Sequence, residues 1–475
     1  MRGQDHEAAQ GEGPGSFLRA PGTLRDAALL RIFLLVLLFG PYLPQTGLFS
    51  CRFRLDHLLV PLLALFFLGR GLRRKDLCLP EWIGRYFLFF LWLGLVTLFL
   101  LFFHPTEVDW PSLTLLLAGV DAYARPLLFL FIASQARLDI EEVKGLVRIV
   151  LWAGVPFTLI AALQLMPATA GWAERFVLLF YNISQDNSSI QGGLKAGRAM
   201  SIFIQVSTFG MFNLLALGLL LAELLGAEIV ASSRHRWILL GTILLGGICS
   251  GSKVFTGGLV LLAALFLFCT PILKRFLRRK IVFGLLIVFC CLGLFLPRLY
   301  SPDRYEKMKT GLLARLDPSR IYEIYLASRF RTEGAGEVGK IFRGEGIGIL
   351  KDHPWRGQGF PVVVHTTDSF FLGMLMMGGI VGFSLFVFFI LSVLRNLYSA
   401  SRKSPAPVAA MARALVFLLV AFLAAAVGFH TLIQDRAGDA YWLITGLVLM
   451  RHLRGERAAP ARSSFEALRM APKSV

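Results

Sequence analysis

Charged residues are scarce in this sequence. They make up 17% of its 475 residues, while 56% are hydrophobic; a soluble domain is about 25% charged and about 45–50% apolar. Cysteine is scarce as well: six cysteines cannot brace a chain of this length, and no Cys-x-x-Cys pair or Cys/His cluster indicates zinc. The composition excludes a soluble multidomain enzyme, a disordered protein and a disulfide scaffold.

Long apolar runs take up most of the chain instead. A transmembrane helix needs about 20 mostly apolar residues, so these runs predict an all-α, polytopic membrane protein with about twelve transmembrane helices. The predicted spans are 27–44, 55–69, 86–104, 112–134, 143–165, 201–225, 237–250, 254–271, 280–297, 368–394, 408–430 and 439–453.

The net charge of +19 has two explanations. A strongly basic soluble protein suggests a nucleic-acid partner, whereas a membrane protein collects lysine and arginine in its cytoplasmic loops. With the N-terminus inside, basic clusters fall in the internal loops at 70–75, 234–236, 274–280 and 395–403, and the external loop 105–111 has no basic residue. The sequence therefore predicts two cytoplasmic termini, contact with membrane lipids and no nucleic-acid partner.

The predicted organisation has five parts. They are a disordered cytoplasmic tail (1–26), transmembrane helices 1–9 (27–297), an external loop domain (298–367), transmembrane helices 10–12 (368–453) and a second cytoplasmic tail (454–475). A smaller external segment contains an amphipathic stretch at 172–181 that is suited to the membrane surface. We find no strong internal repeat, and because many transporters are built from repeats, the pattern disfavours a transporter.

The external loop domain is unusually basic for its predicted side of the membrane. Residues 298–367 hold 12 lysines and arginines against eight acidic residues. One interpretation is an ordinary solvated domain, because long loops escape the charge bias that orients short ones. The other is an anion site, because the planar guanidinium of arginine binds phosphate through two parallel hydrogen bonds.

Several ionisable residues fall within or beside the predicted spans, where each costs about 2.5–3.5 kcal/mol and needs a reason. Asp121 and Arg125 are four residues apart, on one helix face, and we expect them to form an ion pair. Four others stand at the external ends of spans and would share one vestibule if those ends converge. They are Arg198, Lys253, His365 and Asp368.

Five segments of the chain resemble the motifs of one known family. Residues 197–203 (GRAMSIF) have an Arg-x4-Phe pattern where a span begins, and residues 252–253 (SK) interrupt two apolar runs. Residues 352–359 (DHPWRGQG) form a turn, and residues 368–372 (DSFFL) and 379–382 (GIVG) follow in the next span. In order and spacing they resemble the Arg-x4-Phe, Ser-Arg-Gly, D-H-P-x-x-G-x-G and H-N-x-Y-L…G-x-x-G motifs of the O-antigen ligase/polymerase superfamily, over most of residues 28–453.

The resemblance implies a glycosyltransferase of the bacterial inner membrane that works at the periplasmic face without a cofactor. The donor would be a glycan on undecaprenyl diphosphate. The acceptor would be lipid A–core for a ligase and a lipid-linked repeat unit for a polymerase. By resemblance, Arg198 and a loop arginine would hold the diphosphate, and a residue at the start of the tenth span would act on the acceptor hydroxyl.

The chain departs from the family pattern at three places. Asp368 stands where the family has histidine, and the nearby His365 lies three residues earlier, so either side chain could take the acceptor proton. Lys253 replaces the arginine of the break, which keeps the charge but loses the planar fork. Spacing does not assign the loop arginine, for which the candidates are Arg343, Arg331 and Arg329.

The predicted mechanism is metal-independent and inverting, because no carboxylate cluster suited to Mg²⁺ is visible and preplaced cations can stabilise a departing diphosphate. Two other classes stay open. A flippase for lipid-linked glycans would need charged residues along a central path, whereas here the polar residues gather at one face. A non-catalytic scaffold for cell-envelope assembly would tolerate the loss of the candidate site.

Overall fold

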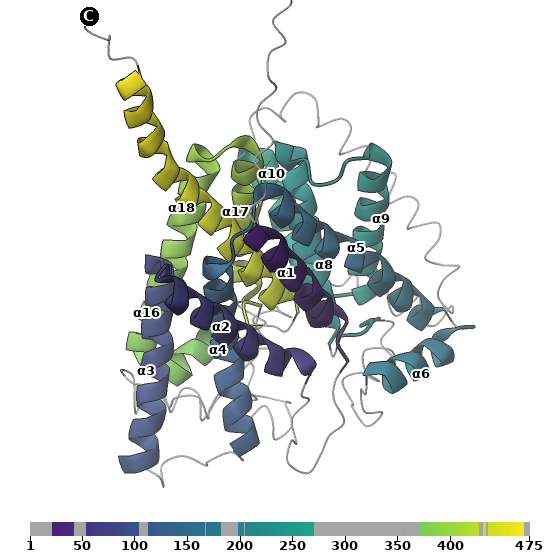
Figure 1. Ribbon diagram of the computed structural model, residues 1–475. Coiled ribbons are helices and arrows are strands. Elements are labelled where there is room, and N and C mark those ends of the chain that lie inside the picture. Colours follow the sequence, from purple (N-terminus) through teal and green to yellow (C-terminus); the bar gives the residue numbers. More distant parts are fainter. Residues whose placement is uncertain are drawn as a thin grey trace, which may run out of the picture.

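In the computed structural model, the elements of the described residues are helices that pack into a bundle, as expected for a helical membrane protein (Figure 1). The structure describes residues 21–41, 54–103, 113–166, 168–181, 198–203, 205–269, 355, 370–426, 431–433 and 436–469. The external loop domain, apart from position 355, lies outside these residues, as does the predicted span at 280–297.

The described helices follow the apolar pattern of the sequence closely. They are α1 (Pro21–Phe39), α2 (Leu55–Arg74), α3 (Glu81–Phe103), α4 (Leu113–Gln135), α5 (Ile140–Leu165), α6 (Ala170–Tyr181), α8 (Val206–Ala222) with the π-helical turn η1 (Glu223–Ala227), α9 (Ser233–Ser250), α10 (Lys253–Cys269), α16 (Phe370–Lys403), α17 (Ala406–Ala426) and α18 (Ala437–Arg469). Helix α6 coincides with the predicted amphipathic stretch, and each other helix overlaps a predicted span.

Six of the described helices are long and apolar enough to cross a membrane: α2, α3, α5, α8 continued by η1, α16 and α17. Their outer faces carry large apolar side chains, as in Leu65, Phe102 and Phe103, which are 61%, 72% and 71% exposed. Side chains of this kind are stable only against lipid or another apolar surface. The protein is therefore a helical membrane protein, while the number twelve stays a prediction.

Several helices extend beyond their predicted spans, and α1, α16 and α18 do so by the most residues. Helix α1 begins at Pro21, six residues before its predicted span, and α18 continues to Arg469, sixteen residues past the predicted end at 453. The reason is that hydropathy marks where a chain leaves the apolar layer, whereas a helix ends only where its backbone hydrogen bonds end. Part of each predicted tail is thus helical.

Side-chain contacts fix the direction of each helix in the bundle. Helices α4 and α18 run parallel, since Arg125 contacts Asp439 near the start of α18 and Arg454 donates to the carbonyl of Ser134 at 3.0 Å. Helix α17 runs antiparallel to α18, since the Tyr441 hydroxyl donates to the Leu415 carbonyl at 3.4 Å and the Ser404 hydroxyl, just before α17, lies 2.8 Å from Nδ1 of His452. Helices α4 and α18 therefore run in the same direction, and α17 runs opposite to both.

The two ends of the bundle are called the break end and the pocket end. The break end is named after the interruption between α9 and α10 at Ser250–Lys253, and it holds Gly40, Gln164, Arg198, Ser252 and Arg436. At the pocket end lie Asp26, Arg70, Cys78, Gln135 and Arg454. The loop charges predict that the break end is external and the pocket end cytoplasmic.

Aromatic side chains pack helices α3, α4 and α16 together. Tyr86 contacts the edge of Phe389 with ring centroids 4.7 Å apart, and Phe89 contacts Phe386 at 5.4 Å. The Tyr86 hydroxyl donates to the carbonyl of Tyr123 at 2.8 Å, so its polar atom is satisfied inside the core. These contacts hold α3 antiparallel to α16 and place α3 beside α4.

Candidate functional site

The structure places two of the seven predicted site residues, Arg198 and Lys253, and brings them to the same feature. That feature is the interruption between α9 and α10, at Ser250–Lys253. The other five lie outside the described residues, so their convergence with this pair stays a prediction. They are His365, Asp368, Arg329, Arg331 and Arg343.

Arg198 lies directly over the break. The backbone N–H of the next residue, Ala199, donates to the Cys249 carbonyl at 2.9 Å. Gly251 has φ 54°, a conformation that glycine adopts without strain, and a Cβ there would lie 2.9 Å from Cγ of Arg198. The glycine of the break therefore leaves room for the aliphatic part of the arginine side chain, which is half-buried.

Lys253 begins α10 at the same break. Its side chain is exposed, and the preceding Ser252 accepts a hydrogen bond from the N–H of Val254 at 3.2 Å. The first N–H groups of a helix carry partial positive charge and attract anions. Arg198, Lys253 and the start of α10 together make the break end electropositive. Burial lowers the pKa of Arg198, as it does for a cation partly removed from water.

The segment that carries Arg198 is held by Gln164 of α5. The side-chain oxygen of Gln164 accepts from the backbone N–H of Ser201 at 2.9 Å, and its amide nitrogen donates to the Ser201 carbonyl at 3.1 Å. A buried amide that pairs in both directions fixes the backbone in one position. The backbone that carries Arg198 is therefore held in a fixed position beside α5.

Arg436 holds the same segment from the opposite side. Its guanidinium donates to the carbonyl of Ile202 at 3.0 Å and to that of Gly40 at 2.9 Å, and it lies over the ring of Phe203. Arg436 itself has φ 63°, an uncommon conformation for a residue other than glycine. Sequence reasoning missed both Gln164 and Arg436, although each is a polar residue in or between apolar runs and could have been singled out for that reason.

A buried ionic cluster supports the residues around Arg436. The guanidinium of Arg125 contacts Asp56 and Asp439, with Nε of Arg125 3.1 Å from Asp439, and Arg54 lies 2.7 Å from Asp56. The expected pair between Asp121 and Arg125 is present at 3.7 Å. However, the closer partners of Arg125 come from α2 and α18, which the spacing along α4 does not show.

Trp355, the one described residue of the segment predicted as a turn at 352–359, contacts α16. Its carbonyl accepts a hydrogen bond from the N–H of Val381 at 3.4 Å. That N–H is available because α16 is kinked at Gly379, where φ is 60° and ψ is −165°. The neighbouring carbonyl of Gly378 accepts from the indole of Trp92 at 2.9 Å.

Within the described residues, no group of three or more histidine, cysteine, aspartate or glutamate side chains is arranged to hold a metal ion. Arg198 and Lys253, beside the N-terminus of α10, are suited to binding an anion. No family model matches the chain, and no curated protein matches it either.

Proposed function

We propose that the protein is a membrane glycosyltransferase that moves a glycan from undecaprenyl diphosphate to an acceptor hydroxyl at the outer face of the bacterial inner membrane. The observation that supports it best is the position of Arg198 over the α9–α10 break, beside Lys253 at the start of α10. The resemblance of the five sequence segments to O-antigen ligases and polymerases is the basis for the proposed donor, acceptor and reaction.

The chemistry follows from the charge of the leaving group. Negative charge grows on the diphosphate as the sugar–oxygen bond breaks, so fixed cations bind the transition state more strongly than the ground state. Arg198 and Lys253 supply two such cations, with Arg329, Arg331 or Arg343 of the external loop as a third. No metal ion takes part in the proposed reaction.

The acceptor hydroxyl attacks the anomeric carbon from the side opposite the diphosphate. A base takes the hydroxyl proton as the new glycosidic bond forms, the diphosphate leaves with the bonding electron pair, and the configuration at that carbon inverts. Asp368 and His365 are the two candidates for the base. The acceptor is lipid A–core in a ligase and a lipid-linked repeat unit in a polymerase.

The proposed topology has twelve spans with both termini in the cytoplasm. Helix α10 starts at the break end, so Cys269 lies toward the pocket end. Helix α16 runs antiparallel to α3, whose first residues lie at the pocket end beside Gln135, so Phe370 lies toward the break end. The chain must change ends between Cys269 and Phe370, and the apolar run at 280–297 provides the crossing.

The decisive experiment is transfer by the purified protein in detergent, with a lipid-linked glycan donor and each acceptor in turn. A flippase moves its substrate across a membrane and forms no glycosidic bond. Product formation in detergent, where there is no membrane to cross, therefore identifies a transferase. Arg198→Ala should lower the transfer rate by about 10²–10³-fold, as for the loss of one fixed electrostatic group. Arg198→Lys, which keeps the charge without the planar fork, should fall between this variant and the wild type.

The matched control is Arg175→Ala, because Arg175 is an exposed arginine of α6, outside the break. This variant should transfer at the wild-type rate. Asp368→Ala and His365→Ala identify the base, since only one of them should abolish transfer. Full activity of both Arg198→Ala and Asp368→Ala would overturn the proposed site.

A deletion strain distinguishes the two acceptors. The strain's surface lipopolysaccharide is separated on a gel, and its lipid-linked glycans are extracted in parallel. Core that carries a single repeat indicates a polymerase, whereas bare core with polymer accumulated on undecaprenyl diphosphate indicates a ligase. An unchanged ladder without accumulated intermediates would remove O-antigen as the substrate.

A further inference from the structure

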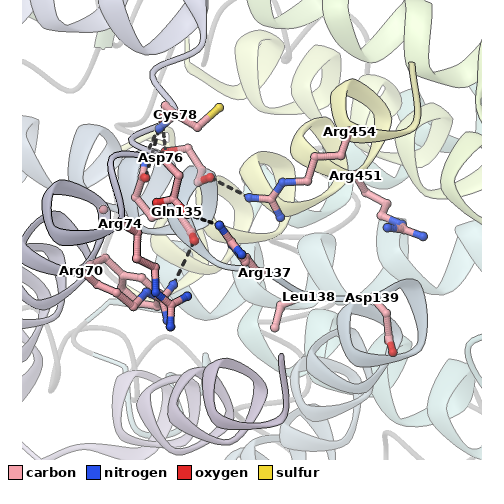
Figure 2. Close-up of a pocket in the computed structure, with 13 residues that line it drawn as sticks. Arg70, Arg74, Asp76, Cys78, Gln135, Arg137, Leu138, Asp139, Arg451 and Arg454 are labelled. Atoms are coloured by element: carbon pink, nitrogen blue, oxygen red, sulfur yellow. Dashed lines mark hydrogen bonds and ion pairs between the residues drawn. The ribbon is translucent and has the colours of Figure 1, made fainter. Parts of the chain in front are cut away.

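A cavity of about 420 Å³ opens at the pocket end, away from the α9–α10 break (Figure 2). It is formed by the end of α2, the connection to α3, the turn between α4 and α5, and the last part of the α18 span. Five arginines line it, against two aspartates: Arg70, Arg74, Arg137, Arg451 and Arg454, with Asp76 and Asp139. Such a surplus of cations around one cavity requires a counter-charge or costs stability.

Two of these arginines are fixed as parts of the wall. Arg70 forms an ion pair with Asp26 of α1 and donates to the Gln135 carbonyl at 3.1 Å. Arg454 donates to the carbonyls of Ala136 and Ser134 at 2.7 and 3.0 Å, so it caps the end of α4. Both guanidinium groups are held in place by partners that they would keep with a ligand bound.

The other three arginines reach the open side of the cavity. Arg137 contacts Asp76, and both side chains are partly exposed. Arg74 and Arg451 are exposed, and among the described residues neither has a carboxylate partner. In Figure 2, Arg74 and Arg451 stand on opposite sides of the cavity, with Arg137 between them. Two arginines without a carboxylate partner among the described residues therefore line the cavity from helices far apart in sequence.

The electrostatic surroundings of Arg454 agree with a surplus of positive charge. Burial lowers its pKa, and the charges of Arg137 and Arg451 lower it further, opposed in part by Cys78 and Asp26. Cations that repel one another in this way gain most from a bound anion.

We propose that this cavity binds the phosphate group of an anionic ligand, either the headgroup of a membrane phospholipid or a soluble phosphorylated compound. Phosphate offers several oxygens, which can accept hydrogen bonds from more than one guanidinium group, whereas a carboxylate offers only two. The cavity volume falls in the range of about 300–1,000 Å³ that is typical of small-molecule sites, so the phosphate and the group that carries it both fit.

This inference does not depend on the proposed transferase function, because the cavity and the break lie at opposite ends of the bundle. The cytoplasmic charge bias accounts for basic residues at this end. It does not account for arginines from separate helices that face one cavity. Basic pockets between membrane helices on the cytoplasmic side bind anionic headgroups in this manner.

The test uses the purified full-length chain with two probes. Phosphatidylglycerol is titrated into the protein in neutral detergent and counted by native mass spectrometry. Glycerol 3-phosphate is titrated calorimetrically into the protein in phosphatidylcholine nanodiscs. Arg74→Gln/Arg451→Gln removes the charges of these two arginines and should raise the Kd of the bound probe at least tenfold, while elution volume and melting temperature stay at the wild-type values.

The matched control is Arg73→Gln/Arg395→Gln, which removes two exposed charges from the same end without altering the cavity lining. This variant should bind within twofold of the wild type. Binding of phosphatidylglycerol alone identifies a lipid headgroup, and binding of glycerol 3-phosphate identifies a soluble ligand. Equal weakening in both double variants, or no binding of either probe, would overturn the proposal.

Discussion

At the scale of single residues, Arg125 of α4 links three helices through its ion pairs. Its side chain is 1% exposed and contacts Asp56 of α2 and Asp439 of α18. Arg125→Ala removes a buried partner of Asp439 and of Asp56, although Asp56 keeps Arg54, and breaking a buried ion pair in this way costs about 3–5 kcal/mol. We expect a markedly lower melting temperature for the purified variant in detergent, and a smaller yield of monodisperse protein.

The control for Arg125→Ala is Arg148→Ala. Arg148 lies 3.9 Å from Glu141, and both side chains are about half exposed, at 46% and 55%. Exposed pairs contribute about 0–1 kcal/mol, so this variant should melt close to the wild type. If Arg125→Ala melts there too, the cluster is not what holds α2, α4 and α18 together.

The ionic cluster also shows what sequence can and cannot predict about single residues. The pair between Asp121 and Arg125 was predictable because a spacing of four places both on one helix face. The contacts of Arg125 with Asp56 and Asp439 join residues 69 and 314 positions apart. Nothing local in the sequence encodes such pairs, since they depend on how the helices pack.

The α9–α10 break depends on a close approach at the scale of elements. Helix α8 passes the break at Gly210, where a Cβ would overlap Cβ of Ser252, an atom fixed to the backbone. Gly210→Ala must therefore push α8 away from the break, and overpacking of this kind costs about 1–3 kcal/mol. We expect a lower melting temperature together with slower glycan transfer, because Arg198 lies against the same break.

Two other glycines provide the comparison for Gly210→Ala. Gly241 of α9 and Gly257 of α10 have no neighbouring atom within 4 Å of an added Cβ. Gly241→Ala and Gly257→Ala should leave transfer unchanged and keep or slightly raise the melting temperature, since alanine favours a helix over glycine. A Gly210→Ala protein that behaves like these two would show that α8 does not set the geometry of the break.

The elements themselves were largely predictable. Apolar runs of about 20 residues located the helices, and the period of residues 172–181 located α6 as an amphipathic helix. The interruption at Ser250–Lys253 was visible as a polar, glycine-containing gap between two runs. What was not predictable is that Arg198 lies over this gap, because Gln164 and Arg436 hold it there through backbone carbonyls and N–H groups that have no sequence signature.

The two ends of the molecule carry different chemistry at the largest scale. The break end presents cations at a helix N-terminus, and the pocket end presents arginines around a cavity. Because the described helices pack into one bundle, the sidedness of any one of them fixes that of the others. A single test of orientation therefore assigns both proposed sites to their sides of the membrane.

That test is cysteine labelling in a variant whose own cysteines are replaced. Trp172→Cys lies on α6, which follows the end of α5 at the break end. Arg234→Cys, at the start of α9, and Arg402→Cys, at the end of α16, lie at the pocket end. With twelve spans and cytoplasmic termini, a membrane-impermeant maleimide should label Trp172→Cys in intact spheroplasts, and the other two only after permeabilisation. External labelling of Arg402→Cys alone would show that the chain does not cross between Cys269 and Phe370. External labelling of both would invert the molecule, and would place the break and its cations in the cytoplasm, where a periplasmic transferase has no substrate.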